Sequence, residues 1–599
     1  MPQTDADDCF EYTTGKWIYN DALRHSERRK IFNIPEFKRL AAHSINQSEH
    51  DLTGFKKLAE GGFNRTFLIT MRDGFQFVAR IPFPVTEPKT LLIANEVATM
   101  DFLRSHGFPI PKVFGYSTVA DNPAGTEYIF MELVTGTNLG EIWFDLSEQE
   151  QKTIITNLVQ LESKLMALRF PASGSLYYCD DLPSNHPRIL IQHESESEST
   201  PSNATNENPK QFCIGPDTSF RLWFGKRLNL NVERGPYQDC FAALTTGATK
   251  EIAYLSKFGK PLLPFQRLRR EVHAYKPQSH KDHIQNLKKY LAIAPALIPT
   301  ESDQYLHRPV IRHPDLQPNN VIVTANLQVK GLIDWQHSTI LPLFLQSGIP
   351  LSIKSQDIVD PGLSSKNLDS EPTSPNPSHS NSDADGDSDD LLQLVGDSTS
   401  KPRHRWTSKE LEIYRRRHLH REYVRQTAAL NAEHFDALSE KYNKLRRRLW
   451  HHAGDPWEGD TITLKADLIG LSRQWAEITG TDASTDADTD ADAISDSDFD
   501  SDTDMGPVSG CPISFSAEEV RECLELNVAQ GEADEQLQEC LDIVGVASEG
   551  WTPVASYDRA KARAEKFKME AFQAAESGEE RRRLEENWIF DDFDEDDYT

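Results

Sequence analysis

Three polar side chains within residues 313–320 have the types and the spacing of a phosphoryl-transfer loop. The segment reads HPDLQPNN, and it fits the pattern H-x-D-x-x-x-x-N through His313, Asp315 and Asn320. In that pattern the aspartate accepts the proton of the substrate hydroxyl, and the asparagine holds a magnesium ion. The segment therefore predicts Asp315 and His313 as catalytic residues and Asn320 as a metal ligand.

The residues that follow this loop can bring a second metal ligand to the same place. Two apolar runs, 321–323 and 329–333, flank a turn-prone Thr-Ala-Asn segment, which is typical of an antiparallel hairpin. In such a hairpin Asn320 and Asp334 lie side by side, and paired oxygen ligands next to phosphates suit Mg²⁺. The alternative is a polar turn before a surface hairpin, with Asp334 as an ordinary strand-end carboxylate.

A glycine-rich turn lies far upstream, in a stretch that predicts three strands over residues 55–81. Gly61 and Gly62 let the backbone come close to a phosphate and present N–H groups to it, and Asn64 follows them. We expect these three residues to contact a nucleotide. A Gly-Gly pair is also common in turns that bind nothing, so the turn alone is a weak signal.

Two charged residues downstream of this turn form a candidate ion pair. Arg80 ends the third strand, at the position where protein kinases have their phosphate-binding lysine. Glu96 shares one face of a predicted helix, residues 91–104, with apolar side chains, and a buried carboxylate needs a partner. We expect the two to pair and to orient the phosphates. The alternatives are an exposed strand-end arginine and a glutamate at a helix edge.

The periodicity of the chain predicts two lobes. Residues 128–133, YIFMEL, resemble an edge strand and hinge that meets adenine, through Met131 and Leu133. An amphipathic helix follows over residues 149–169, where the apolar period changes from 2 to 3.6. These features indicate an α+β protein of the two-lobed, protein-kinase-like type, with a small antiparallel β lobe, a larger helical lobe and disordered acidic insertions.

Composition narrows the class of protein further. The 599 residues carry 64 Lys plus Arg against 93 Asp plus Glu, a net charge of −29, which disfavours nucleic-acid binding. The seven Cys form no C-x-x-C pair, so reduced thiols inside the cell are expected. No apolar run is long enough to enter a membrane, and the N-terminus has neither signal-peptide nor transit-peptide character.

The chain divides into five predicted parts. One of them contains the stretch of residues 480–504, which is rich in Asp. Ala491 and Ser497 stand where a calcium-binding EF-hand loop needs Gly and Glu, so we interpret this stretch as a solvated acidic tract.

The five parts follow one another along the chain. They are an N-terminal extension (1–50), a nucleotide-binding β lobe (51–135), a helical lobe with disordered inserts near 190–210 and 363–402 (136–475), an acidic disordered segment (476–508), and a C-terminal helical region with an acidic tail (509–599).

Five motifs, EGGFN, VAR, ANEVATM, HPDLQPNN and LIDWQ, together resemble the aminoglycoside phosphotransferase-like (phosphotransferase enzyme) family. The resemblance spans roughly residues 55–345. It implies ATP and Mg²⁺ as cofactors, Asp315 as catalytic base, Asn320 and Asp334 as Mg²⁺ ligands, and Arg80 with Glu96 as the phosphate-orienting pair. More narrowly, the chain is similar to the fungal branch named for altered inheritance of mitochondria protein 9, through LAEGGFNRTFLITM and LPLFLQSGIP.

The sequence departs from the family at two places. The family loop often reads HGDLHPGN, and here Pro314, Gln317 and Asn319 replace a Gly, a His and a Gly. At the end of the third strand Arg80 replaces a lysine, so a planar guanidinium group takes the place of the compact ammonium group that is usual there. The branch name suggests mitochondria, and the cytoplasm is the alternative compartment.

Two functions follow from these observations. The first is an ATP- and Mg²⁺-dependent kinase that phosphorylates a hydroxyl or amine of an unknown small molecule. The second is a pseudokinase or scaffold that binds nucleotide without catalysis and offers its acidic and disordered segments to protein partners. Arg80 and the insertions favour the second, whereas the intact Asp315, Asn320 and Asp334 favour the first. A protein kinase would need an activation segment, which the sequence after Asp334 lacks.

Overall fold

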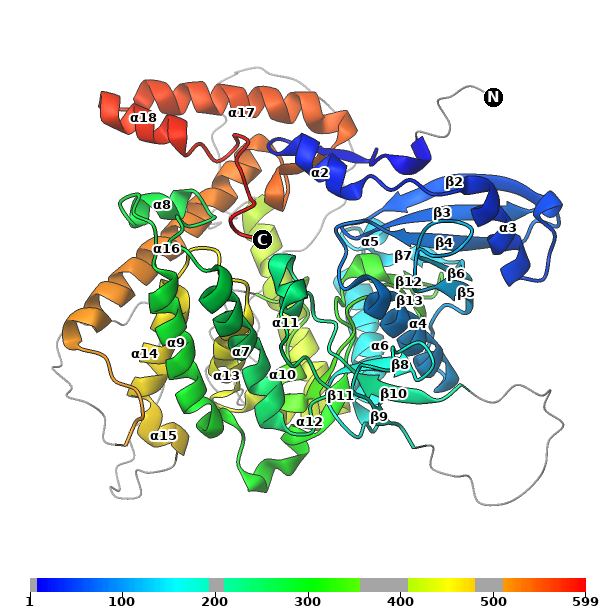
Figure 1. Ribbon diagram of the computed structural model, residues 1–599, viewed down its shortest axis with the longest axis horizontal. Coiled ribbons are helices and arrows are strands. Elements are labelled where there is room, and N and C mark those ends of the chain that lie inside the picture. Colours follow the sequence, from blue (N-terminus) through cyan, green and yellow to red (C-terminus); the bar gives the residue numbers. More distant parts are fainter. Residues whose placement is uncertain (1–7, 193–209, 356–407, 480–509) are drawn as a thin grey trace, which may run out of the picture.

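The computed structural model describes residues 8–192, 210–355, 408–479 and 510–599. The predicted inserts near 190–210 and 363–402 and the acidic segment fall almost wholly outside these ranges. Within them the chain has the two lobes that the sequence predicts, a small β lobe at the right of Figure 1 and a larger helical lobe at the left. No helix in the described ranges is long and apolar enough to cross a membrane.

The small lobe is built on one antiparallel sheet of five strands, in the order β2-β3-β4-β6-β5. Its first three strands follow one another through tight turns, and Gly74, with φ +86°, supplies the left-handed residue of the second turn. The strands are β2 (Leu52–Glu60), β3 (Asn64–Met71), β4 (Gln76–Pro82), β5 (Val113–Ser117) and β6 (Tyr128–Glu132).

Strand alternation decides which side chains of this sheet face the site. Phe77, Ala79 and Ile81 of β4 pack in one cluster with Phe37 of α3 (Ile34–Ser44), on the outer face. Val78 packs on the opposite face, in the cluster that includes α4 (Lys89–Ser105). Because side chains alternate along a strand, Arg80 also lies on the α4 face, which carries Glu96.

The large lobe packs helices around a second apolar core, with short strands beside them. Its main helices are amphipathic, and α6 begins with a capping box in which Ser147 and Glu150 satisfy each other's backbone N–H groups. The helices are α5 (Leu139–Ile142), α6 (Glu148–Ala167), α7 (Cys240–Phe258), α8 (Leu268–Val272), α9 (His280–Ile293), α10 (Leu343–Gln346), α11 (Ser408–Leu430), α12 (Ala432–Ser439), α13 (Asn443–Gly454), α14 (Ile462–Arg473) and α15 (Trp475–Thr479). The strands are β7 (Thr137–Asn138), β8 (Ser175–Tyr178), β9 (Ile189–Leu190), β10 (Phe212–Gly215), β11 (Pro309–Ile311), β12 (Val321–Val323), β13 (Val329–Leu332) and β14 (Ile340–Pro342).

Segments near the two ends of the chain lie side by side (Figure 1). Strand β1 (Gly15–Trp17) pairs antiparallel with β15 (Trp551–Pro553). The helix α2 (Asp21–Arg28) follows β1. Three C-terminal helices, α16 (Ala517–Val544), α17 (Val554–Ala574) and α18 (Gly578–Glu586), complete this part. The N-terminal extension is therefore held by the C-terminal region as well as by the small lobe.

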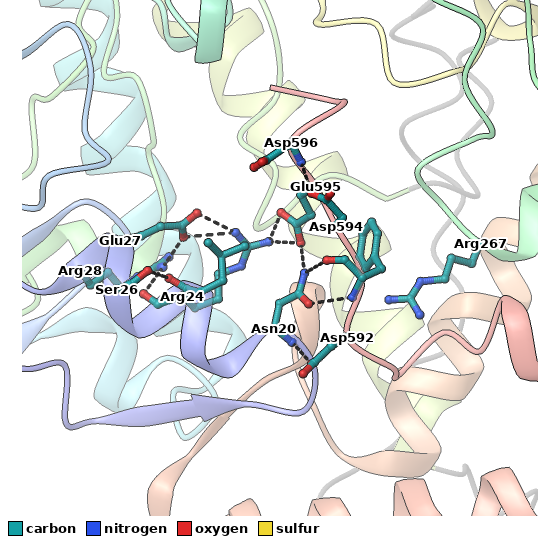
Figure 2. A network of polar contacts seen from close by, with 12 residues as sticks. Asn20, Arg24, Ser26, Glu27, Arg28, Arg267, Asp592, Asp594, Glu595 and Asp596 are labelled. Carbon is teal, nitrogen blue, oxygen red and sulfur yellow. Dashed lines mark hydrogen bonds and ion pairs between the residues drawn. The ribbon is translucent and has the colours of Figure 1, made fainter.

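Acidic residues after α18 form hydrogen bonds and ion pairs with the N-terminal segment, in the polar network of Figure 2. Glu595 accepts hydrogen bonds from Arg24 at 2.7 and 2.6 Å and from Asn20 at 2.6 Å. On the side of the large lobe, Arg267 donates to the backbone oxygen of Asp591 at 2.5 Å. The predicted acidic tail thus bonds to both the N-terminal segment and the large lobe.

The N-terminal segment in turn contacts the strand end that precedes the glycine-rich turn. The backbone N–H groups of Thr13 and Thr14 donate to the Glu60 carboxylate at 2.8 and 3.1 Å. Arg65 donates to the same carboxylate at 2.8 Å. A chain of contacts therefore runs from the acidic tail to the residue before Gly61.

Glu595→Gln should lower the free energy of unfolding by about 1–3 kcal/mol, because it weakens charge-assisted hydrogen bonds between side chains that are only 13% and 10% exposed. Urea unfolding followed by circular dichroism would measure the change. The matched control is Glu585→Gln, whose ion pair with Arg581 is 58% and 52% exposed and should contribute little. Equal unfolding free energies for the two variants would contradict the fastening role of Glu595.

Candidate active site

The hairpin predicted after residue 320 is confirmed. Val321 of β12 pairs with Leu332 of β13, and the N–H of Ile333 donates to the Asn320 carbonyl at 3.0 Å. This register brings Asn320 beside the end of β13, where Asp334 follows. Asp334 has φ +67°, a left-handed conformation that is uncommon for a residue with a side chain and that often marks functional sites.

Arg80 joins the two lobes at this point. Its Nη1 donates to Glu96 Oε1 at 2.5 Å, and its Nη2 donates to Asp334 Oδ1 at 2.5 Å. The predicted Arg80–Glu96 pair is therefore present, with only 9% and 1% of the two side chains exposed. The contact to Asp334 goes beyond the prediction. A planar guanidinium can reach two carboxylates at once through separate nitrogens, which the single ammonium of a lysine does less readily.

Burial and charge act differently on the two carboxylates that Arg80 joins. Burial raises the pKa of Glu96 to about 7, since the nearby charge of Arg80 offsets the desolvation only in part and Asp334 adds to the rise. Burial also opposes ionisation of Asp334, but the charge and the hydrogen bond of Arg80 outweigh it and lower the pKa of Asp334 below its usual range. The Asp334 side chain is 44% exposed and, with this lowered pKa, stays ionised where it meets solvent.

Within the described residues, only one carboxylate oxygen of Asp315 accepts hydrogen bonds. Its Oδ2 accepts from Gln317 Nε2 at 2.5 Å and from Asn320 Nδ2 at 3.2 Å. Partial burial raises the pKa of Asp315. The hydrogen bonds from Gln317 and Asn320 oppose that rise, and the negative charge of Asp334 adds to it. The loop thus fixes one oxygen of a partly exposed carboxylate and leaves the other available to an acceptor hydroxyl.

His313 is buried behind this loop, and the backbone uses both of its ring nitrogens. Nε2 lies 2.9 Å from the Ile333 carbonyl, and Nδ1 accepts from the Asp315 N–H at 3.2 Å. Burial lowers the pKa of His313 to about 4, so the ring is neutral. Its ring also packs edge-on against Trp335, with centroids 4.6 Å apart. In this geometry His313 fixes the loop relative to β13 and has no nitrogen left for a substrate.

Asn320 offers the oxygen that the metal hypothesis requires. Its Nδ2 donates to the Asp315 carbonyl at 2.9 Å as well as to the Asp315 side chain, so the amide orientation is fixed with Oδ1 on the other side. Asn320 Oδ1 and the Asp334 carboxylate are therefore the protein oxygens that could hold Mg²⁺. Two protein oxygens fit Mg²⁺ bound to phosphates, which supply further ligands together with water. Among the described residues, no group of three His, Cys, Asp or Glu side chains could hold a metal ion.

The glycine-rich turn lies directly over the segment that follows Asp334. A Cβ added at Gly62 would have no neighbour within 4 Å, and a Cβ added at Gly61 would meet only the backbone oxygen of Asn64, at 3.9 Å. Packing within the chain therefore does not require glycine at either position. The Phe63 ring lies 5.5 Å from that of His337 and 5.9 Å from that of Phe220. The Asn64 amide lies against both Arg80 and Gln336.

The predicted hinge residues lie in the apolar core between the lobes. Met131 is 7% exposed and pairs with Val78 of β4, and Leu133 packs partly buried in the same cluster. That cluster also contains Val78 of β4 and Leu332 of β13, which come from the two lobes.

Gln336 and His337 have no predicted role, whereas the run that contains Phe220, residues 220–224, is predicted either to shape a pocket beside the catalytic loop or to be packing. Their contacts with Asn64 and Phe63 join segments more than 150 residues apart in the chain. The available signal was position, because Gln336 and His337 follow Asp334 directly within the quoted LIDWQ motif. Phe220 belongs to an aromatic run, FRLWF, whose neighbours Leu222 and Trp223 are buried in the core.

Fold and site together define a two-lobed, kinase-like α+β protein. A sequence model of the phosphotransferase enzyme family matches residues 54–344. Residues 54–344 are therefore similar to the phosphotransferase enzyme family, and the resemblance drawn from the five motifs is confirmed.

Several known proteins are similar to this chain. A subtelomeric hrmA-associated cluster protein of Aspergillus fumigatus is 28% identical over 578 residues, covering 90% of this chain and 96% of that protein. The altered inheritance of mitochondria protein 9, mitochondrial, of Clavispora lusitaniae is 25% identical over 385 residues, covering 56% of this chain and 61% of that protein. A solved ternary complex of streptomycin and ATP with APH(2″)-IIa shares 13% identity, covers 53% of this chain and 76% of that chain, and has a TM-score of 0.29.

Proposed function

We propose that this protein is a phosphotransferase that transfers the γ-phosphoryl group of ATP to a hydroxyl or amine of a small molecule. The observation that carries the proposal is one site assembled from three distant segments. Asp315 and Asn320 come from the loop, Asp334 from the end of the hairpin, and Arg80 with Glu96 from the small lobe. The match of residues 54–344 to the phosphotransferase enzyme family supports the same reaction class.

Each part of the site has a role in this proposal. Asn320 and Asp334 would hold Mg²⁺, which would supply neutralisation of the charge on the phosphates. Asp315 accepts the proton of the acceptor through its free oxygen, and His313 positions the loop. Gly61, Gly62 and Asn64 cover the phosphates, Arg80 and Glu96 orient them, and Met131 and Leu133 contact adenine.

Open space at the glycines supports the roles given to the turn. A glycine that packing does not require can still serve a ligand, because only a residue without Cβ lets a phosphate approach the backbone closely. The fold tolerates a Cβ at Gly62, so a specific requirement for glycine there would arise from the ligand.

The second candidate is a pseudokinase or scaffold that binds nucleotide without catalysis. The direct Arg80–Asp334 contact favours it, because the proposed metal ligand is engaged by a cation of the protein itself. The free oxygen of Asp315 favours the enzyme. The acidic segments remain candidates for contact with protein partners in either case. Mitochondria are the first compartment to examine, because relatives at 24–26% identity carry that word in their names.

A thermal-shift titration with ATP tests the proposed function. ATP with Mg²⁺ should raise the melting temperature of the parent, by the equivalent of about 2.7 kcal/mol at a hundred times the dissociation constant. Asp334→Asn should abolish the dependence on Mg²⁺, because it removes a charged metal ligand. Asp558→Asn, at an exposed position of α17, is the control and should behave as the parent. Absence of any shift in the parent would refute both the enzyme and the nucleotide-binding scaffold.

A further inference from the structure

Gln336 has the position of a ligand-contacting residue, although the motif patterns assign it no role. It is 6% exposed and lies two residues after Asp334. Its Oε1 accepts from Arg80 Nη2 at 2.9 Å, which anchors one end of the amide. The amide of Asn64 contacts Gln336 from the glycine-rich turn.

The other end of the same amide has no partner. Gln336 Nε2 is buried and makes no hydrogen bond within the described part of the chain. An unsatisfied buried donor is unfavourable, so such groups are rare in folded proteins and require an explanation. A bound ligand with acceptor atoms is one such explanation, and phosphate oxygens are strong acceptors.

The next residue repeats this arrangement. His337 Nδ1 lies 2.8 Å from the Thr218 carbonyl, which fixes the ring, and its Nε2 is buried without a partner in the described residues. His337 has φ +61°, a strained conformation for a residue with a side chain. Phe63 of the glycine-rich turn packs on its ring. Two consecutive side chains beneath the turn therefore each have one anchored polar atom and one unpaired polar atom.

We propose that Gln336 contacts the terminal phosphates of the bound nucleotide, with Nε2 donating to a phosphate oxygen. The proposal rests on the proposed nucleotide site and adds a residue to it. Phosphates between the glycine-rich turn and Asp334 separate Asn64 from Gln336, and both amides then bind phosphate oxygens. Gln336 also keeps its contact with Arg80, so the amide holds the guanidinium while it binds the ligand. The contact favours ATP and ADP over AMP, which lacks the terminal phosphates.

Nucleotide titrations by calorimetry test this assignment on the full chain. ATP, ADP and AMP would each be titrated into the parent, Gln336→Ala and Gln336→Met. The methionine variant keeps the side-chain volume and serves if the alanine variant destabilises the fold. Loss of one hydrogen bond to a charged group should weaken ATP and ADP binding by about 10- to 100-fold and leave AMP binding unchanged. Gln328→Ala, at an exposed position of the hairpin turn, is the control and should bind all three as the parent does.

The outcomes separate this inference from the proposed function. A parent that binds no nucleotide overturns both. A parent that binds ATP while both Gln336 variants bind it equally well overturns the role of Gln336 alone. Equal weakening for ATP and AMP also overturns it, because a general disturbance of the cleft would then account for the loss.

Discussion

Asp315→Asn is expected to lower the rate of ATP turnover by about 10²- to 10⁴-fold, the range by which positioned proton transfer accelerates reactions. Asparagine keeps the shape of the side chain and can still accept a hydrogen bond, but it cannot take a proton. The free Asp315 oxygen is the atom that would receive that proton, since Gln317 and Asn320 both bond to the other oxygen. Slow hydrolysis of ATP by water measures the effect without knowledge of the acceptor.

The dependence of this rate on pH adds an independent check. The base must be ionised, so activity should fall as the pH drops through the pKa of Asp315. Because partial burial and the charge of Asp334 raise that pKa, the fall should occur above the 3.8 of an ordinary aspartate. Asp121→Asn, at an exposed loop position of the small lobe, is the control. Equal turnover in Asp315→Asn and the parent would remove the catalytic role and favour the scaffold.

Local patterns were sufficient to predict much of this site. The hairpin from β12 to β13 follows from two apolar runs and a turn, and its register alone places Asn320 near Asp334. The Arg80–Glu96 pair follows from a buried charge that needs a partner. Each of these inferences depends on neighbours in sequence or on a single strong physical requirement, which one sequence can reveal.

Contacts between distant segments could not be predicted in the same way. No pattern in the chain shows that Asn64 meets Gln336 or that Arg80 also reaches Asp334, because those contacts depend on how the two lobes close. The pairing of β1 with β15 joins residues at opposite ends of the chain, and each strand has only three residues, too few for a clear alternation. The charged run at residues 591–597 suggests solvation, although in the fold it bonds to Arg24, Asn20 and Lys568.

A buried ion cluster in the large lobe leads to the largest stability prediction. Glu251 of α7 accepts from Arg227 Nη2 at 2.6 Å and from Lys250 Nζ at 2.8 Å, and all three side chains are 0% exposed. Glu251 also accepts from the Trp457 N–H at 2.8 Å. Lys250 donates to the Gly454 carbonyl at 3.0 Å, which joins α7 to the end of α13. One carboxylate thus balances two buried cations between helices of the core.

The protonation states of this cluster follow from burial and mutual charge. Burial by itself would raise the pKa of Glu251, but Lys250 and Arg227 lower it from 4.5 to about 2. A carboxyl whose pKa is lower in the folded state stabilises the fold above its unfolded pKa. This stabilisation is lost as the pH falls from about 4.5 to about 2. Burial lowers the pKa of Lys250 to about 8, although the charge of Glu251 opposes this shift. The lysine is therefore still mostly protonated at pH 7.

Glu251→Ala is therefore expected to lower the free energy of unfolding by about 3–5 kcal/mol, because removing one member of a buried ion pair leaves its partners without a counter-charge. Glu251→Gln keeps the volume and one acceptor oxygen, so it should fold even if alanine does not, and it should still be destabilised. Urea unfolding at pH 7 measures the free energy of unfolding of both variants. Glu477→Ala is the control, because the side chains of Glu477 and its partner Lys441 are 56% and 64% exposed. That exposed pair should contribute at most about 1 kcal/mol. If Glu251→Gln matched the stability of the parent, the charge of Glu251 would not be needed, and the cluster would depend on packing and hydrogen bonds alone.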